Sequence, residues 1–309
     1  MKALVTGGAG FIGSNLVDRI LSLGHEASVI DNESSDSNGQ YFWNPLAKNH
    51  LGDINDFSAI KEASKGCDVV FHLAAEARIQ PSIKNPRLSV KTNMLGTCNV
   101  LQAAIENSVK RVLYSSTSSA YGLSNPAPQA EEMPNDCLNP YAVSKVAGEE
   151  LCKMYSRLYG LETVIFRYFN VYGNRQPTKG SYATVIGKFQ KQIKDGKPMT
   201  VVGDGLQRRD YTNVDDVVSI NLLAASADSS IVSGQTFNVG TGRNYSINDL
   251  VSLFSKKKTP VEGVDFEFIG ERVGESQETL ANIDKSFHYL GWKPTVELPN
   301  WISLTGEIN

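Results

Sequence analysis

The sequence contains little cysteine, and its cysteines are scattered. Four occur in 309 residues (Cys67, Cys98, Cys137 and Cys152), with no CxxC pair and no cluster of cysteine with histidine. This distribution argues against a structural metal site and against a disulfide framework, and it is typical of proteins in a reducing compartment. We therefore expect no bound metal and a cytoplasmic location.

Long hydrophobic runs and an excess of positive charge are also missing. No apolar stretch approaches the roughly 20 residues that span a bilayer, and the strand-like segment 2–6 follows Met1 directly, without room for a signal peptide. The chain has 30 Lys and Arg against 33 Asp and Glu, a net charge of −3. Such a chain has no overall field that recruits nucleic acid or an anionic membrane, so we expect neither as a partner. Local donors must hold any phosphate.

What the chain does contain is an alternation of short apolar runs with longer amphipathic segments. The alternation predicts strands at 2–6, 26–31, 68–73, 110–115 and 162–168, and helices at 11–23, 56–65, 86–107 and 140–159. It indicates an α/β fold with a doubly wound parallel sheet, the Rossmann arrangement. This alternation of predicted strands and helices ends near residue 170. We expect a sheet domain of residues 1–169 plus about 213–240, and a smaller C-terminal substrate-binding domain of 170–212 plus 241–309.

A glycine-rich motif, Thr6-Gly7-Gly8-Ala9-Gly10-Phe11-Ile12-Gly13, lies between the first predicted strand and the first helix. Gly7 permits a tight turn, Gly10 lets the backbone approach a pyrophosphate, and Gly13 lets helix and strand pack closely. Free N–H groups and the helix dipole favour an anion at that helix terminus. Glycines are common in turns, so the placement of the motif, more than its composition, indicates a dinucleotide site.

Two acidic residues follow at the ends of the next strands. Asp31 lies 18 residues after Gly13, where a carboxylate accepts both ribose hydroxyls of the adenosine half and repels a 2′-phosphate, which favours NAD over NADP. The alternative is an ordinary turn at Asp31-Asn32. Asp53, in Gly52-Asp53-Ile54, is a candidate for the adenine amino group, although it could equally cap the helix at 56–65.

Asn139-Pro140-Tyr141-Ala142-Val143-Ser144-Lys145 opens a helix, with Asn139 as its cap and Pro140 in its first turn. Tyr141 and Lys145 are four residues apart and so lie on one face. A tyrosine with its ordinary pKa near 10 is a poor base, but a lysine cation one turn away and a positive nicotinamide ring both favour the phenolate. A tyrosine and a lysine four residues apart often occur on helices by chance. Downstream of the glycine motif, this pair indicates a general base and its partner.

A hydroxyl-rich segment, Tyr114-Ser115-Ser116-Thr117-Ser118-Ser119-Ala120-Tyr121-Gly122, ends the strand at 110–115. Ligands of parallel sheets bind at the carboxyl ends of the strands, so a hydroxyl there can hydrogen-bond a reacting substrate hydroxyl. Without Tyr141, a serine-rich loop with no chemical role would be the better interpretation.

With these motifs the chain resembles, along nearly its whole length, the extended short-chain dehydrogenase/reductases of the UDP-hexose (UDP-galactose / UDP-N-acetylglucosamine) 4-epimerase branch. The resemblance implies an enzyme with bound NAD that epimerises C4 of a UDP-sugar through a transient 4-keto sugar, with Thr117, Tyr141 and Lys145 as its catalytic residues. It also implies a set of cofactor-binding residues: Gly7, Gly10, Phe11, Ile12, Gly13, Asp31, Asn32, Asp53, Ile54, Ala74, Ala75, Asn93, Ser115, Tyr141, Lys145 and Tyr168.

The same resemblance implies the substrate site, which comprises Thr117, Tyr141, Asn170, Val202, Arg209, Tyr211, Arg272, Glu275 and Thr279. Arg209 would clamp a phosphate with its bidentate fork, and Arg272 is the second phosphate arginine. At the position of Thr279, a tyrosine restricts the pocket to glucose and galactose. The smaller threonine predicts that UDP-N-acetylglucosamine and UDP-N-acetylgalactosamine are accepted.

Several alternatives stay open at this point. Nucleotide-sugar 4,6-dehydratases and UDP-glucuronate decarboxylases carry an acid just after the catalytic threonine, where this chain has Ser118 and Ser119. UDP-glucuronate 4-epimerase and C2 epimerases are harder to separate. An NAD-sensing regulator on the same fold is the alternative outside enzymes, since a fold alone does not establish activity. By family habit we expect a homodimer formed through the helices at 86–107 and 140–159.

Overall fold

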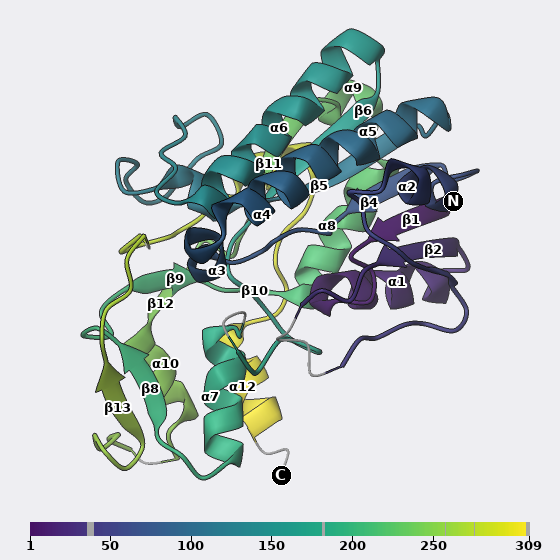
Figure 1. Ribbon diagram of the computed structural model, residues 1–309. Helices are drawn as coiled ribbons and strands as arrows, with labels where there is room; N and C mark the ends of the chain where they lie inside the picture. The colour runs from purple at the N-terminus through teal and green to yellow at the C-terminus, as the bar shows by residue number, and fades with distance from the viewer. Residues whose placement is uncertain (36–39, 181–182, 257, 275, 307–309) are drawn as a thin grey trace.

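The computed structural model describes residues 1–35, 40–180, 183–256, 258–274 and 276–306. A seven-stranded sheet forms its centre, and all neighbouring strands in that sheet run parallel (Figure 1). In spatial order the strands are β11 (Gln235–Val239), β6 (Glu162–Tyr168), β5 (Arg111–Thr117), β4 (Val69–His72), β1 (Lys2–Thr6), β2 (Glu26–Asp31) and β3 (Lys48–Leu51). From β1 the chain builds outward first on one side and then on the other. The order therefore reverses between β1 and β4, the point where Rossmann sheets bind dinucleotides.

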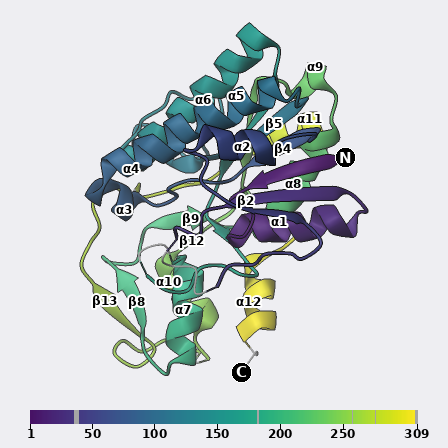
Figure 2. The ribbon, with the colours of Figure 1, turned by 45° about the vertical axis from the view of Figure 1, so that its right-hand side comes forward.

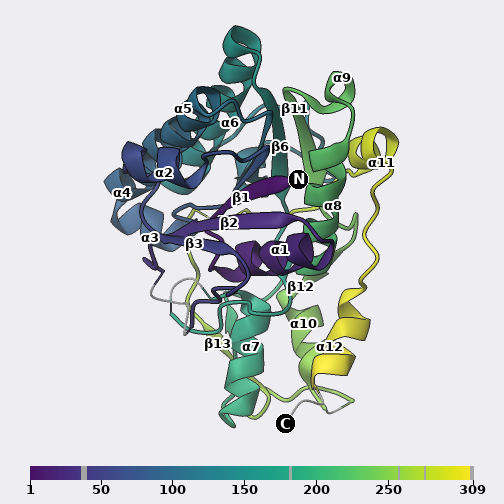
Figure 3. The ribbon, with the colours of Figure 1, turned by 90° about the vertical axis from the view of Figure 1, so that its right-hand side faces the viewer.

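Helices cover both faces of this sheet, as the strands' apolar character requires. In Figure 3 the sheet is seen between two helical layers. One layer contains α1 (Phe11–Ser22) and α8 (Val214–Ser226), and the other contains α2 (Phe57–Ala63), α5 (Thr97–Glu106) and α6 (Pro140–Tyr159). A separate buried apolar cluster lies between each layer and the sheet. The predicted α/β fold with a doubly wound parallel sheet is confirmed.

The segment predicted as one helix at 86–107 is helical but not uniform. It consists of α4 (Pro86–Val90), a π-helical turn η1 (Lys91–Gly96) and α5. The wider turn contains Asn93, which is buried and reaches sideways: its Nδ2 donates to Ser144 Oγ at 2.9 Å and to Glu76 O at 3.0 Å. Single π turns often occur at functional sites, and this one links the helix to α6 and to the loop after β4.

The second half of the chain contributes a smaller lobe beside the carboxyl ends of the strands (Figure 2). Its elements are β7 (Val171–Tyr172), α7 (Val185–Lys194), β8 (Met199–Val202), β9 (Arg208–Asp210), β10 (Thr212–Asn213), β12 (Asn244–Ser246), α10 (Ile247–Phe254), β13 (Phe266–Ile269) and α12 (Leu298–Gly306). Three short strand pairs, β7 with β10, β8 with β13 and β9 with β12, replace a large sheet there.

The remaining short elements are α3 (Ile79–Lys84), the 3₁₀ turn η2 (Ser118–Tyr121), α9 (Ser229–Val232) and α11 (Asp284–Leu290). The chain returns to the central sheet through α8, α9 and β11, and α11 packs against β11 and α8. Trp292, just after α11, is 2% exposed within the core cluster of the sheet. The division into two domains stays a prediction.

Candidate active site

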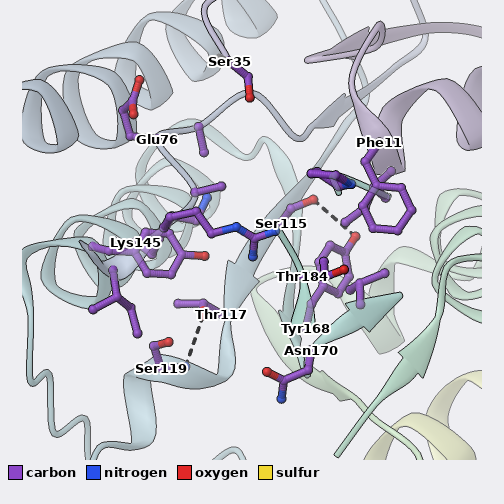
Figure 4. A pocket seen from close by; sticks show the side chains of 18 of the residues that line it. Phe11, Ser35, Glu76, Ser115, Thr117, Ser119, Lys145, Tyr168, Asn170 and Thr184 are labelled. Atoms are coloured by element: carbon purple, nitrogen blue, oxygen red, sulfur yellow. Dashed lines mark hydrogen bonds between the residues drawn. The ribbon is translucent and has the colours of Figure 1, made fainter. Parts of the chain in front are cut away.

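A cavity of about 510 Å³ opens at the carboxyl ends of the sheet strands and continues into the smaller lobe. Its lining comes from the residues that end or follow β1, β2, β4, β5 and β6, and from α6, α7 and the loops around β9. Figure 4 shows side chains from both halves of the chain around this space, with Lys145, Thr117 and Ser115 from the first half and Asn170 and Thr184 from the second. The cavity thus joins the two halves of the chain.

The glycine-rich turn forms one wall of the cavity and has no room for side chains. Gly7 has a φ of +69°, and a Cβ at this position would lie 2.9 Å from the backbone nitrogen of Ala74. Gly13 is equally constrained, because its Cβ would lie 2.2 Å from Gly7 O. Gly10 caps α1 without any side-chain hydrogen bond to the first turn. The first turn of α1, from Gly10 to Gly13, therefore lines the cavity without a side-chain cap, which fits the pyrophosphate of a dinucleotide.

The acidic residues that follow β2 and β3 also line this part of the cavity. Asp31 Oδ2 accepts a hydrogen bond from the Ala9 amide at 3.1 Å, and burial raises the pKa of this carboxyl group. Asn32 Nδ2 donates to Asp53 Oδ2 at 3.0 Å. The cap of α2 is Asp56 and not Asp53, because Asp56 accepts from the amides of that helix. Asp31 and Asp53 together fit an adenosine group.

The pair on α6 lies where the sequence predicts it. Asn139 caps the helix by accepting from Ala142 N, and Pro140 lies in the first turn, as expected. Tyr141 and Lys145 line the cavity beside Thr117, whose Oγ1 accepts from Ser119 N at 3.1 Å. Lys145 is 2% exposed, with its ammonium 4.2 Å from the centre of the Tyr114 ring.

The electrostatics of Tyr141 differ from the expectation drawn from the sequence. Burial raises the pKa of Tyr141, while hydrogen bonding with Thr117 and the positive charge of Arg78 lower it. The pKa of Lys145 itself falls to about 7 because burial disfavours the ammonium, opposed by Cys152 and Glu149. Arg78 is therefore a cation, in addition to the predicted lysine, that favours the phenolate.

Three further side chains connect the floor of the cavity to the smaller lobe. Tyr168 Oη accepts from Ser115 Oγ at 3.2 Å and from Asn221 Nδ2 at 2.7 Å, and burial raises the pKa of Tyr168 to about 12. Asn170, two residues later, donates to Thr279 Oγ1 at 3.3 Å. Thr279 is 7% exposed and borders the cavity.

Positive charge collects at the end of the cavity that the smaller lobe contributes. Arg209, Arg272 and Lys188 all line it, and burial together with the charge of Arg272 lowers the pKa of Lys188. Tyr211 lies between them and the sheet, 3% exposed, with no hydrogen-bond partner for its Oη among the described residues. Buried hydroxyl groups are normally satisfied, so this group and the three cations fit an anionic ligand such as a diphosphate.

The structure brings nearly all predicted site residues to this one cavity. Asn93 is the exception among the described residues, because its side chain supports α6 and the loop after β4 and does not line the cavity. Glu275 lies outside the described residues. The sequence interpretation missed Arg78 and Lys188, which line the cavity from the start of α3 and from α7. Neither belongs to a motif with a known spacing.

His72 illustrates a buried residue that supports the site without reaching it. Its Nδ1 lies 2.8 Å from Thr6 Oγ1 and its Nε2 lies 2.9 Å from Thr97 Oγ1, so both ring nitrogens are satisfied. Burial and, to a smaller extent, the positive charge of Lys145 lower the pKa of His72 to about 3. The ring is therefore neutral at physiological pH and ties β4 to β1 and α5.

A parallel sheet that ends in a glycine-lined cavity at its switch point is the arrangement of dinucleotide-dependent α/β enzymes. The chain belongs to the NAD dependent epimerase/dehydratase family, whose model matches residues 3–240. A putative UDP-glucose 4-epimerase of Methanocaldococcus jannaschii is 36% identical to it over 307 residues, which cover 97% of this chain and 95% of the relative.

Two solved structures show the same likeness in three dimensions. The UDP-glucose 4-epimerase of Thermotoga maritima, solved with UDP-glucose, matches with a TM-score of 0.91 at 33% identity, covering 99% of this chain and 98% of that one. A UDP-N-acetylglucosamine 4-epimerase of Methanobrevibacter ruminantium, in complex with UDP-N-acetylmuramic acid, matches with a TM-score of 0.86 at 30% identity, covering 98% of each chain. The predicted family, the enzyme class and NAD as cofactor are confirmed.

Proposed function

We propose that the protein is a 4-epimerase of UDP-hexoses that accepts UDP-N-acetylglucosamine and UDP-N-acetylgalactosamine, as well as or instead of UDP-glucose and UDP-galactose. The observation that carries this proposal is the small side chain of Thr279 at the wall of the cavity. Its backbone is fixed, since Thr279 N donates to Arg208 O at 3.0 Å, and its Oγ1 is held by Asn170. A threonine at this wall leaves space that a tyrosine ring would fill.

The chain's own residues supply the proton transfers of this reaction. Tyr141, as phenolate, accepts the proton of the C4 hydroxyl, and Thr117 beside it holds that hydroxyl in line. Bound NAD, held by the glycine-rich turn, Asp31 and Asp53, would supply the acceptor and then the donor of the C4 hydride, with a transient 4-keto sugar that would turn within the cavity. Tyr141 would return its proton to the C4 oxygen at the end of the cycle.

Arg209, Arg272 and Lys188 would hold the diphosphate throughout this cycle, with Tyr211 as a further donor. Keeping the nucleotide fixed while the sugar turns is required for hydride return on the other face. Three cations at one end of the cavity attract such an anion locally, although the protein has a net charge of −3.

The direct test incubates the purified enzyme separately with UDP-glucose, UDP-N-acetylglucosamine and UDP-glucuronate, and identifies the products by NMR. We expect the N-acetylated substrate to give its C4 epimer, and Tyr141→Phe to lose at least about 100-fold in turnover, the low end of general-base loss. Absence of any epimer from all three substrates would refute the proposed function.

Thr279→Tyr tests the role assigned to the cavity wall. We expect the ring to lower kcat/KM for UDP-N-acetylglucosamine about 10-fold or more by excluding the acetamido group, while UDP-glucose turnover is spared. Thr279→Ser keeps the hydroxyl and the small volume and serves as the matched control. Equal losses on both substrates, or no loss on either, would contradict this role.

UDP-glucuronate is the second candidate substrate, and Arg78 is the observation that favours it. This cation lines the cavity near Tyr141, and an arginine fork pairs well with a carboxylate. Conversion of UDP-glucuronate in the three-substrate test, together with its loss in Arg78→Gln, would establish this alternative.

We also propose a cytoplasmic homodimer. Among the described residues, no helix combines the length and the apolar character needed to cross a membrane, and all four cysteines are free. A groove along α4, η1 and α6 is lined mainly by apolar side chains, including Val90, Met94 and Leu95. An exposed apolar groove on the helices expected to pair supports association with a second copy.

A further inference from the structure

A buried ion pair lies directly beneath the cavity and outside every motif discussed above. Glu149 on α6 and Arg167 on β6 are joined by two hydrogen bonds, Nε to Oε1 at 3.0 Å and Nη2 to Oε2 at 2.8 Å. Their side chains are 0% and 3% exposed. Glu149 follows Lys145 by one helical turn and Tyr141 by two, and Arg167 immediately precedes Tyr168. The pair therefore touches the two elements that carry most of the proposed chemistry.

Neighbouring groups extend this pair into a network. Ser116, between Ser115 and Thr117 on β5, donates its hydroxyl to Glu149 Oε1. Arg167 Nη2 also donates to Asn135 Oδ1 at 2.7 Å, and its guanidinium lies 4.7 Å from the centre of the Tyr121 ring. One carboxylate thus connects α6, β5 and β6 at the level of the cavity floor.

Lys145 is the cavity residue one helical turn before Glu149 on α6. Burial lowers the pKa of Lys145 to about 7, while Cys152 and Glu149 raise it. At such a value, small changes in the surroundings decide whether the lysine is charged at neutral pH.

Among the described residues, four buried ionisable side chains near Lys145 do not supply a negative charge: His72, Tyr114, Tyr141 and Cys152. His72, from β4, is neutral because burial lowers its pKa to about 3. Tyr114, from β5, stays a phenol because burial raises its pKa, and it offers only its ring face to the ammonium. Burial likewise raises the pKa of Tyr141 on α6, and Arg78 beyond it carries positive charge. Burial also raises the pKa of the Cys152 thiol, which leaves Glu149 as the fixed anion among these groups.

We propose that the Glu149–Arg167 pair is a positioning element of the active site, in which Glu149 keeps Lys145 in its ammonium form and Arg167 holds Glu149 in place. The role of the ammonium rests on the proposed function. Stability alone explains the pair poorly, because a buried ion pair gains little over apolar residues of similar volume. Glu149 lies one helical turn after Lys145, a location from which its negative charge can stabilise the lysine ammonium.

A second buried ion pair, which joins β5 to β6, provides a control for a purely structural role of Glu149 and Arg167. Arg111 on β5 and Glu162 on β6 are paired at the opposite ends of these strands, away from the cavity, and the Arg111 side chain is 2% exposed. Glu162→Gln therefore removes the carboxylate partner of the buried Arg111 between β5 and β6 without changing the charge near Lys145. Glu150→Gln removes an exposed charge from α6 and serves as a further control.

The experiment follows the Lys145 side chain by NMR in the NAD-loaded protein labelled with ¹³C-lysine, with the signal assigned through Lys145→Met. We expect its titration midpoint to move to lower pH in Glu149→Gln, and the alkaline limb of kcat/KM to move in the same direction. If the unpaired Arg167 prevents folding, Glu149→Gln with Arg167→Leu removes both charges. Its midpoint should still lie below that of the wild type, though by less than in the single variant, because Glu149 lies one turn from Lys145 on α6 whereas Arg167 lies on β6.

Unchanged midpoints in Glu162→Gln and Glu150→Gln, alongside the lowered midpoint of the Glu149 variants, would support the proposal. A Glu149 variant that titrates like the wild type would overturn it, as would an equal fall in Glu162→Gln. The NMR titration needs no turnover. Lack of epimerase activity in the wild type would therefore refute the proposed function and leave the midpoints to decide the role of Glu149.

Discussion

At the scale of single residues, the cavity is a place where burial works against the protonation states that catalysis needs. Burial raises the pKa of Tyr141, which must lose a proton to act as base, and lowers that of Lys145, which must keep one. Neighbouring side chains oppose both shifts: Thr117 and Arg78 for the tyrosine, Cys152 and Glu149 for the lysine. The reactive pair therefore depends on groups that no Tyr-xxx-Lys motif includes.

Arg78→Gln tests this dependence for Tyr141. Loss of the cation removes one of the two effects that lower the pKa of Tyr141, so this pKa rises further above its ordinary value. The phenolate exists only above that pKa, and the acid limb of kcat/KM therefore moves to higher pH. Turnover at neutral pH falls about 10-fold for each unit that the limb moves.

Arg78→Lys keeps a positive charge and should hold the limb nearer to its original position. Lys84→Gln, which removes an exposed charge at the other end of α3, is the matched control. An acid limb that stays in place in Arg78→Gln would show that the guanidinium does not act on Tyr141.

At the scale of elements, the register of α6 against β5 determines where the reactive pair lies. The helix crosses the strand at Gly148, where a Cβ would lie 2.2 Å from Tyr114 Oη and 2.5 Å from its Cζ. Tyr114 Oη in turn donates to Lys145 O at 3.1 Å. The absence of a side chain at one position on α6 thus permits the contact that places Tyr141 and Lys145.

Gly148→Ala should therefore destabilise the protein although alanine is the better helix former. The helix propensity gain is about 1 kcal/mol, whereas forcing a methyl group into a packed interface costs about 1–3 kcal/mol and more where a buried ring must move. We expect a lower melting temperature and a reduced kcat, since the helix shifts away from the strand.

The double variant Gly148→Ala with Tyr114→Leu provides the control for this prediction. The shorter side chain removes the atoms that clash, so the two substitutions should destabilise less than the sum of their separate effects in a denaturation experiment. Additive effects would show that Gly148 is needed for a reason other than this contact.

At the scale of the whole molecule, the proposed dimer gives a role to the apolar groove that the fold leaves on its surface. Val90, at the end of α4, and Met94 and Leu95, on η1, are 45%, 44% and 51% exposed. In Figure 1, α4 lies in the helical layer that contains α5 and α6, and the residues that line the groove are different from those that line the cavity. Association there would cover the groove and leave the cavity open to substrate.

Leu95→Glu places a charge in this groove and should convert a wild-type dimer into monomers in sedimentation velocity experiments at equal concentration. Burial of an unpaired carboxylate in an apolar interface is strongly unfavourable. Leu46→Glu, at an 80% exposed position before β3, is the matched control and should leave the mass unchanged. A wild-type monomer, or a Leu95→Glu dimer, would contradict the proposed interface.

The sequence by itself determined the features that depend on local backbone geometry. The glycine-rich turn, the Asn139 cap and the common face of Tyr141 and Lys145 all follow from spacings of a few residues, because turns and helices repeat over that length. The alternation of strands and helices predicted the doubly wound sheet for the same reason. A parallel sheet then brings the carboxyl ends of its strands to one edge, which is why nearly all predicted site residues meet in one cavity.

Only the tertiary structure decided which charges act on the reactive pair. Arg78 reaches Tyr141 from the loop after β4, Lys188 comes from α7, and Glu149 meets Arg167 across the interface of α6 with β6. Electrostatic effects depend on distance in space and on burial, and neither is encoded in the spacing of residues along the chain. The motifs locate the reaction, and the packing of separate elements sets the protonation states with which it proceeds.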